Sequence, residues 1–422
     1  MAPFSSFLVK CALLLAVSSA LGTSTYIVGA YYLGMWSRAA YDPPDLNYHD
    51  RTFYLGQGED VWLGVRTIHD GNASFINATN PSWLAHWDEF SAWYNSTPAL
   101  KRKPALGYYD VSQDAVLEAH IAQATSHGLR FFNFYYYWQA YTNSEEMADA
   151  LHTFVRVTGR SGAGAMQFTL SVCADGWYHS IIRSNIPKVA AVLAGYFARP
   201  NYLVTSVGSP IIELCDVVGI MEDGQLPTPP ASPDWSPSGP IATFISALRN
   251  ASMAATGHYP FILGRFDMAG KAYVEGLDSL VDGGGCVLSW QPADGDYYRQ
   301  ATSTYANLES IRTKKPFSPC VANNMDDRPR MGIMKNDNFA VMSNYSQENW
   351  ELSLREAKRW VDDHADEMSH VVSIYAWNVS FLARKKADPH TTSARIQRPH
   401  PKPKPFIPYL KGVARRRLDR AQ

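Results

Sequence analysis

Short apolar runs alternate with amphipathic stretches along most of the chain, and this alternation is the main structural signal in the sequence. Leu117, Ile121 and Ala124 recur at the spacing of one helical face, and Gly128 stands where a helix C-cap is favoured. The apolar run Leu129–Trp138 follows at once and predicts a strand after that helix. The same succession recurs, with strands expected at residues 26–34, 104–110, 129–138, 168–177, 201–216, 259–267, 285–291, 318–330 and 371–378, and further helices near residues 144–157, 186–198, 241–255, 297–312 and 346–364.

About eight strand–helix repeats, with strands rich in Val, Ile, Phe and Tyr, predict a parallel α/β architecture. A chain of 422 residues with this pattern favours a (β/α)8 TIM-type barrel over an open sheet. No expected strand ends in a G-x-G-x-x-G or G-x-x-x-x-G-K-[ST] sequence, which disfavours nucleotide-binding folds. Residues 35–103 are polar and Trp-rich, so we expect a long insertion after the first strand.

The first residues have the features of a secretory signal peptide, which we expect to span residues 1–22. Lys10 precedes the apolar stretch Cys11–Val17, and small residues surround a cleavage position near Ala20. A buried first helix is the alternative. The apolar stretch is shorter than the ~20 residues that a membrane-spanning helix needs, so we expect a secreted protein without a membrane span.

Secretion changes how the asparagines and cysteines are interpreted. Six N-x-Ser/Thr sequons are candidate glycosylation sites: Asn72, Asn77, Asn95, Asn250, Asn344 and Asn378. Four cysteines follow the expected signal peptide: Cys173, Cys215, Cys286 and Cys320. Four thiols allow three disulfide pairings, among which the sequence does not choose, and free buried cysteines are equally compatible with it.

Charge divides the chain into an acidic body and a basic tail. Residues 379–422 hold 12 Lys and Arg against 2 Asp and Glu, whereas the whole chain has a net charge of −1. The tail also holds six prolines and little apolar material, so we expect it to be largely disordered. The expected organisation is a signal peptide at residues 1–22, a barrel at residues 23–378 and a Pro-rich basic tail at residues 379–422.

Aromatic side chains dominate the expected carboxyl ends of the strands, with carboxylates and amides between them. In a (β/α)8 barrel these ends form the active-site face. Aromatic faces pack on the C–H faces of sugars, and carboxylates and amides pair with sugar hydroxyls. The composition therefore predicts a carbohydrate cleft, and the residues expected to line it are Tyr32, Tyr109, Asp110, Tyr136, Trp138, Asp175, Trp177, Asp267, Asp327, Arg328, Trp377 and Asn378. The histidines form no H-x-H or H-E-x-x-H motif, so we expect no metal or other cofactor.

Six segments, in this order, resemble glycoside hydrolase family 99 and the related WbsX-like proteins: YIVGAYYLGMW, LGYYDVSQDAVLEAHIAQATSHGLRFFNFYYYW, FTLSVCADGW, GSPIIELCD, NNMDDRPRMG and IYAWN. The resemblance spans most of residues 26–378. It implies a (β/α)8 barrel and retaining, metal-free cleavage of α-mannosides or related glycans. In that family the last strand ends Trp-Asn-Glu-Trp-x-Glu-Gly. One Glu assists the sugar 2-hydroxyl as nucleophile, and the other is the general acid/base.

The chain departs from the family pattern at these two catalytic positions. Trp377 and Asn378 match, but Val379 and Leu382 stand where the family has glutamates. Neither side chain can transfer a proton, and the loss of one positioned acid/base typically lowers a rate 10²–10⁴-fold. The chain as written is therefore not expected to hydrolyse glycans by the family mechanism.

Three explanations remain open. The barrel binds glycan without cleaving it, or another carboxylate pair acts, such as Asp175 with Asp267 or Asp326, or the sequence from Val379 onward follows a displaced reading frame. The break in charge and proline content coincides with the break in the motif, and the codons around Arg384–Ala387 permit Glu-Gly in a shifted frame. We expect a glycan-processing barrel without its catalytic glutamates, and a non-catalytic carbohydrate-binding barrel is the alternative.

The expected partner is an oligo- or polysaccharide, with no nucleic acid bound by the barrel. A third possibility takes the basic tail as an anchor for acidic polysaccharide or nucleic acid.

Overall fold

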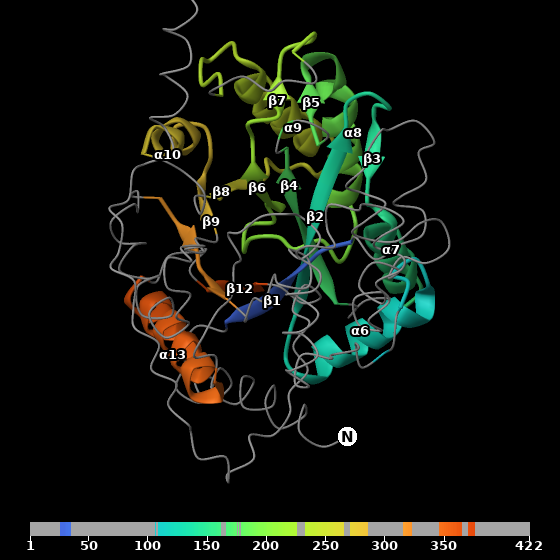
Figure 1. Ribbon diagram of the computed structural model, residues 1–422, viewed down its shortest axis with the longest axis vertical. Helices are drawn as coiled ribbons and strands as arrows, with labels where there is room; N and C mark the ends of the chain where they lie inside the picture. The colour runs from blue at the N-terminus through green and yellow to red at the C-terminus, as the bar shows by residue number, and fades with distance from the viewer. Residues whose placement is uncertain are drawn as a thin grey trace, which may run out of the picture. The chain divides into compact units, whose positions relative to one another are not determined.

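The computed structural model describes residues 26–34, 106, 109–161, 166–174, 176, 179–225, 233–265, 271–285, 315–322, 346–364 and 370–375, which Figure 1 draws as ribbons. The expected signal peptide, the long insertion and the basic tail lie outside the described residues. The sequons other than Asn250 also lie outside them, whereas Asn250 is an exposed residue of a helix.

Parallel strands form a ring. Its members, in spatial order, are β10 (Phe317–Ser318), β9 (Gly283–Gly285), β8 (Phe261–Arg265), β6 (Ile211–Asp216), β4 (Gln167–Cys173), β2 (Phe131–Gln139), β1 (Ile27–Tyr32), β12 (Val371–Tyr375) and β11 (Cys320–Ala322). Only Pro319 separates β10 from β11, and these two strands pair with β9 and β12, respectively. They therefore act as one strand position that joins the two ends of the sheet, and the described strands form an eight-position (β/α)8 barrel.

The interruption at Pro319 has a simple cause. A proline has no backbone N–H to contribute to the ladder, so it ends regular pairing at that point. Its carbonyl still accepts a hydrogen bond from the Ser373 N–H at 3.1 Å. This contact continues the connection to β12 across the break.

Helices follow most of the strands and lie around them (Figure 1): α6 (Asp114–Ser126), α7 (Asp149–Ser161), α8 (Ile186–Phe197), α9 (Pro240–Thr256), α10 (Lys271–Asp278) and α13 (Gln347–Asp363). Local signals mark several ends. Pro240 begins α9, Gly257 ends it at φ 78°, and the Ser346 side chain caps α13 by accepting from the Asn349 N–H at 3.2 Å. In the described part of the chain, no helix is both long and apolar enough to cross a membrane.

Three short strands lie outside the ring in the described part of the chain. β3 (Ser144–Glu146) pairs antiparallel with the end of β2, and β5 (Ile181–Ile182) pairs with β7 (Ile220–Met221) in a separate two-stranded sheet. Residues 144–146 were expected to begin a helix, but they form β3, and α7 begins at Asp149.

The expected strand at residues 104–110 is not part of the ring. Its described residues Leu106, Tyr109 and Asp110 are not in a strand, and β1 pairs directly with β2 through Gly29–Tyr32 and Phe131–Phe134. The Asp110 carboxylate instead accepts from the Ser112 N–H at 2.9 Å, in a turn that leads into α6.

Two apolar layers stabilise the barrel. The outer layer lies between strands and helices and includes Phe132, Phe134 and Phe168. The inner layer closes the amino-terminal end of the barrel with a separate cluster of Phe131, Leu203, Ile211, Leu263 and Val371. These side chains fill the amino-terminal end of the barrel interior. The polar side chains of the interior therefore lie nearer the carboxyl ends of the strands.

Candidate functional site

A buried carboxylate lies inside the barrel. Glu213 on β6 is 4% exposed, and both of its oxygens accept hydrogen bonds. Tyr31, at the end of β1, donates from its hydroxyl at 2.5 Å, and Ser171 on β4 donates from its Oγ at 2.7 Å. Because β2 and β4 lie between β1 and β6 in the ring, the Tyr31–Glu213 bond crosses the barrel interior. Paired donors of this kind are what a buried carboxylate requires.

Arg265 is a buried cation in the same part of the barrel interior as Glu213. It is the last residue of β8, it is 5% exposed, and its Nη1 donates to the Tyr135 hydroxyl at 3.0 Å. The guanidinium lies 5.9 Å from the ring centres of Tyr31 and Tyr135 and 5.4 Å from that of Tyr375. Three electron-rich faces therefore surround one cation.

Burial keeps the Tyr31 and Tyr135 hydroxyls protonated. Desolvation raises the pKa of Tyr31 well above its usual value, the Glu213 charge raises it further, and the Arg265 charge opposes the shift. Burial likewise raises the pKa of Tyr135 against the effect of Arg265. Both hydroxyls are thus hydrogen-bond donors at any physiological pH.

A disulfide between Cys173 and Cys215 joins β4 to β6 at the carboxyl end of the barrel, with 4.7 Å between the Cα atoms. The sequence left this pairing open. Arg265 Nη1 also lies 3.2 Å from the Cys215 sulfur, so the disulfide contacts the cluster around the cation. Cys320 is disulfide-bonded as well.

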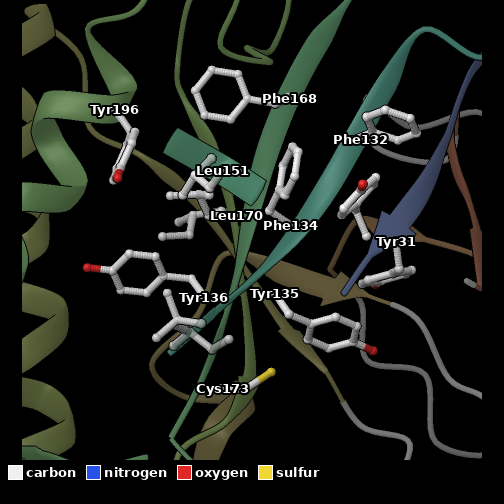
Figure 2. Packing of buried hydrophobic residues seen from close by; sticks show 14 of the residues in the cluster. Tyr31, Phe132, Phe134, Tyr135, Tyr136, Leu151, Phe168, Leu170, Cys173 and Tyr196 are labelled. Carbon is white, nitrogen blue, oxygen red and sulfur yellow. The ribbon is translucent and has the colours of Figure 1, made fainter. Parts of the chain in front are cut away.

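The expectation that Tyr32, Tyr136 and Trp138 line the cleft is corrected by the structure, which places them on the helix-facing side of their strands. The Tyr32 hydroxyl lies 2.8 Å from Nδ1 of His120 on α6, the Tyr136 ring contacts Tyr196 of α8, and Lys188 of α8 lies 5.8 Å from the Trp138 ring. Neighbouring strand residues face opposite sides, so the inward positions belong to the residues next to them. Figure 2 shows Tyr135 and Tyr136 pointing away from each other on β2.

Tyr109 and Asp110 are described but belong to the segment that precedes α6. The Tyr109 ring packs edge-on against His120, with 4.9 Å between the ring centres, and burial raises its pKa. The remaining expected cleft residues lie outside the described part of the chain: Asp175, Trp177, Asp267, Asp327, Arg328, Trp377 and Asn378.

The residues expected to line the cleft did not include the inward-facing group of Tyr31, Tyr135, Glu213, Arg265 and Tyr375. The available signal was Glu213 itself, because a lone carboxylate within the apolar run Ile211–Leu214 must be buried and paired. Among the described residues, no cluster of three or more His, Cys, Asp or Glu side chains could hold a metal ion. Tyr31 and Ser171 each donate to one Glu213 oxygen, so the carboxylate is held in a fixed position inside the barrel.

No protein-family model and no curated protein sequence matches the chain. Among solved structures, it is similar to a GH99 endo-alpha-mannosidase from Bacteroides thetaiotaomicron, at 11% identity over 83% of this chain and 84% of that one, with a TM-score of 0.45. It is also similar to a glycoside hydrolase-like protein, at 13% identity over 66% and 79% of the two chains, with a TM-score of 0.47. A GH113 beta-1,4-mannanase is similar at 8% identity over 63% and 81%, with a TM-score of 0.34. The strand order, independently of these similarities, defines the (β/α)8 fold.

Proposed function

We propose that this protein binds glycans at the carboxyl-terminal mouth of a glycoside hydrolase-like barrel and, with the present sequence, does not cleave them. The observation that carries the proposal is the inward-facing cluster of Tyr31, Tyr135 and Tyr375 around Arg265 and Glu213. It combines aromatic faces with strong donors and acceptors, which is the composition that sugar rings and their hydroxyls need.

The absence of turnover is supported by the sequence after β12. Hydrolysis with two carboxylates requires a general acid/base and a nucleophile, or a second base, on opposite sides of the scissile bond. Val379 and Leu382 stand at the two positions where the resembled family has glutamates. Glu213 is a single carboxylate, held by Tyr31 and Ser171, and so does not supply the missing pair.

An α-mannoside or a related α-linked glycan is the proposed ligand, on the basis of the family resemblance. Passage through the secretory pathway is proposed from residues 1–22 and is supported by the Cys173–Cys215 disulfide, which is typical of an oxidising compartment. The displaced reading frame remains a second proposal, in which the natural protein carries the Glu pair and hydrolyses the glycan.

The test is a glycan array probed with the full chain, followed by chromatography of each captured glycan after prolonged incubation with the protein. Capture without product release supports the proposal. Released product would refute the proposed lack of turnover, and capture of no glycan would remove the glycan function altogether. Sequencing the transcript through the codons for Tyr375–Gln422 distinguishes the displaced frame from the present one.

A further inference from the structure

The hairpin between β2 and β3 presents two chemically different faces. Its antiparallel register places Tyr137 opposite Glu146, and Trp138 opposite Glu145. Cross-strand partners project to the same side, and consecutive residues project to opposite sides. Tyr137 and Glu146 therefore share one face, and Trp138 and Glu145 share the other.

The face with Tyr137 points toward the barrel interior. The Tyr137 ring stacks on that of Tyr135 at an interplanar angle of 13°, with 6.2 Å between the ring centres. Tyr135 in turn contacts Arg265. Tyr137 thus extends the proposed sugar-binding cluster outward to the rim of β2.

His179 and Gln139 join this face. An isolated antiparallel bridge pairs Gln139 with His179, so their side chains lie on the same side as Tyr137. The His179 ring centre is 4.3 Å from that of Tyr137, and its Nε2 is 3.5 Å from Glu146 Oε2. The side chains of His179 and Glu146 remain 17% and 9% exposed.

Gln139 contributes a positioned donor. It is 6% exposed, and its Oε1 accepts from the Tyr141 N–H at 3.1 Å, which fixes the orientation of the amide. Its buried Nε2 has no hydrogen-bond partner among the described residues. A buried amide N–H without a partner is costly, so a ligand hydroxyl that accepts from it would be strongly favoured.

The backbone holds His179 in place. The Gly176 N–H donates to the His179 carbonyl at 3.3 Å, the Ser180 N–H donates to the Trp138 carbonyl at 3.0 Å, and Gly176 has φ 91°. Gly219 packs so closely against Gly176 and His179 that a Cβ would lie 2.4 Å from Gly176 N and 2.8 Å from the His179 carbonyl oxygen. The His179 backbone is therefore held by its own hydrogen bond and by close packing against Gly219.

The opposite face of the hairpin is structural. Glu145 accepts from the Tyr196 hydroxyl at 2.7 Å and lies 3.1 Å from His152 Nε2, so it ties the hairpin to α8 and α7. Trp138 lies under Lys188 of α8. The two adjacent glutamates of the hairpin therefore lie on opposite faces.

We propose that Tyr137, Gln139, Glu146 and His179 form a rim subsite for one neutral hexose unit of the glycan, an inference that rests on the proposed glycan function. The Tyr137 ring packs on the apolar face of the sugar, and the Glu146 carboxylate accepts from two adjacent hydroxyls. The Gln139 amide and the His179 imidazole supply the complementary donors. Glu146 is a binding residue here and takes part in no bond cleavage.

The experiment is a calorimetric titration of an α-linked mannotriose into the full-length wild type, Glu146→Gln, His179→Gln and the matched control Glu145→Gln. Thermal melting of each variant reports on its folding. Losing a charged acceptor to sugar hydroxyls predicts a dissociation constant about tenfold to hundredfold higher for Glu146→Gln. His179→Gln is expected to weaken binding at least threefold, on the order of one lost neutral hydrogen bond, and Glu145→Gln is expected to keep the wild-type dissociation constant while melting earlier.

Equal dissociation constants for wild type and both Glu146→Gln and His179→Gln overturn the subsite and leave the glycan function intact. Equal weakening by Glu145→Gln and Glu146→Gln also overturns it, because the effect then comes from loss of the hairpin. A wild type that binds neither mannotriose nor any glycan of the array removes the proposed function and the subsite with it.

Discussion

Removing one hydroxyl from each of two neighbouring tyrosines of β1 tests which of them belongs to the barrel interior. Tyr31→Phe deletes a donor to the carboxylate of Glu213, whereas Tyr32→Phe deletes a contact with the neutral His120 ring. A hydrogen bond to a charged group contributes about 1.5–3 kcal/mol, and a neutral one about 0.5–1.5 kcal/mol. Tyr31→Phe is therefore expected to lower the free energy of unfolding by about 2 kcal/mol, and Tyr32→Phe by about 1 kcal/mol.

Urea denaturation followed by tryptophan fluorescence measures both losses, and an unchanged m-value shows that the unfolding transition is comparable. The double-mutant cycle of Tyr31→Phe with Glu213→Gln isolates the pair, with an expected coupling energy above ~1 kcal/mol. The same cycle of Tyr32→Phe with Glu213→Gln is the control and should show no coupling. A Tyr31–Glu213 coupling below ~0.5 kcal/mol, or equal coupling in both cycles, would refute the assignment of Tyr31 to the interior.

Three further predictions concern stability. The Cys173–Cys215 disulfide closes a sequence separation of 42 residues, so replacing both cysteines by serine should lower the free energy of guanidinium unfolding by about 4 kcal/mol; a loss under ~1 kcal/mol contradicts this. Burial lowers the pKa of His120 to about 4, below its ordinary value. The unfolded chain therefore binds more protons than the folded one between these values, so stability is complete above about pH 6.5 and falls by up to about 3 kcal/mol as the pH drops toward 4. Urea unfolding from pH 7 to 4 should show this slope in wild type but not in His120→Phe, and identical slopes would count against it. A Cβ on Gly29 would lie 2.5 Å from the Phe131 ring. Gly29→Ala should therefore lower the melting temperature, through overpacking that costs about 1–3 kcal/mol. An unchanged melting temperature would show that the inner layer is loosely packed.

The hydrophobic periodicity of the sequence located individual helices and strands well, because each element has its own pattern of apolar residues. The stripe through Leu117 and Ala124 lies in α6, and the apolar run after Gly128 contains β2. The run before Tyr109 has the same composition as a strand, yet β1 pairs directly with β2. Composition alone does not reveal which apolar run enters a sheet.

The candidate site was harder to predict because the strands are buried on both faces. Parallel strands of this kind have apolar residues at consecutive positions, so alternation does not show which of Tyr31 and Tyr32, or Tyr135 and Tyr136, faces inward. The facing becomes visible only through partners such as Glu213 and the helices. The Cys173–Cys215 pairing was likewise undetermined until β4 and β6 were known to be neighbours.

A crystal structure of the protein soaked with the glycan that the array captures would show where the glycan binds. We expect intact glycan at the carboxyl-terminal mouth of the barrel, with sugar rings against Tyr135, Tyr137 and Tyr375 and hydroxyls near Arg265. Glycan bound on the helix-facing side or at the amino-terminal end of the barrel, or a cleaved glycan at the mouth, would contradict it.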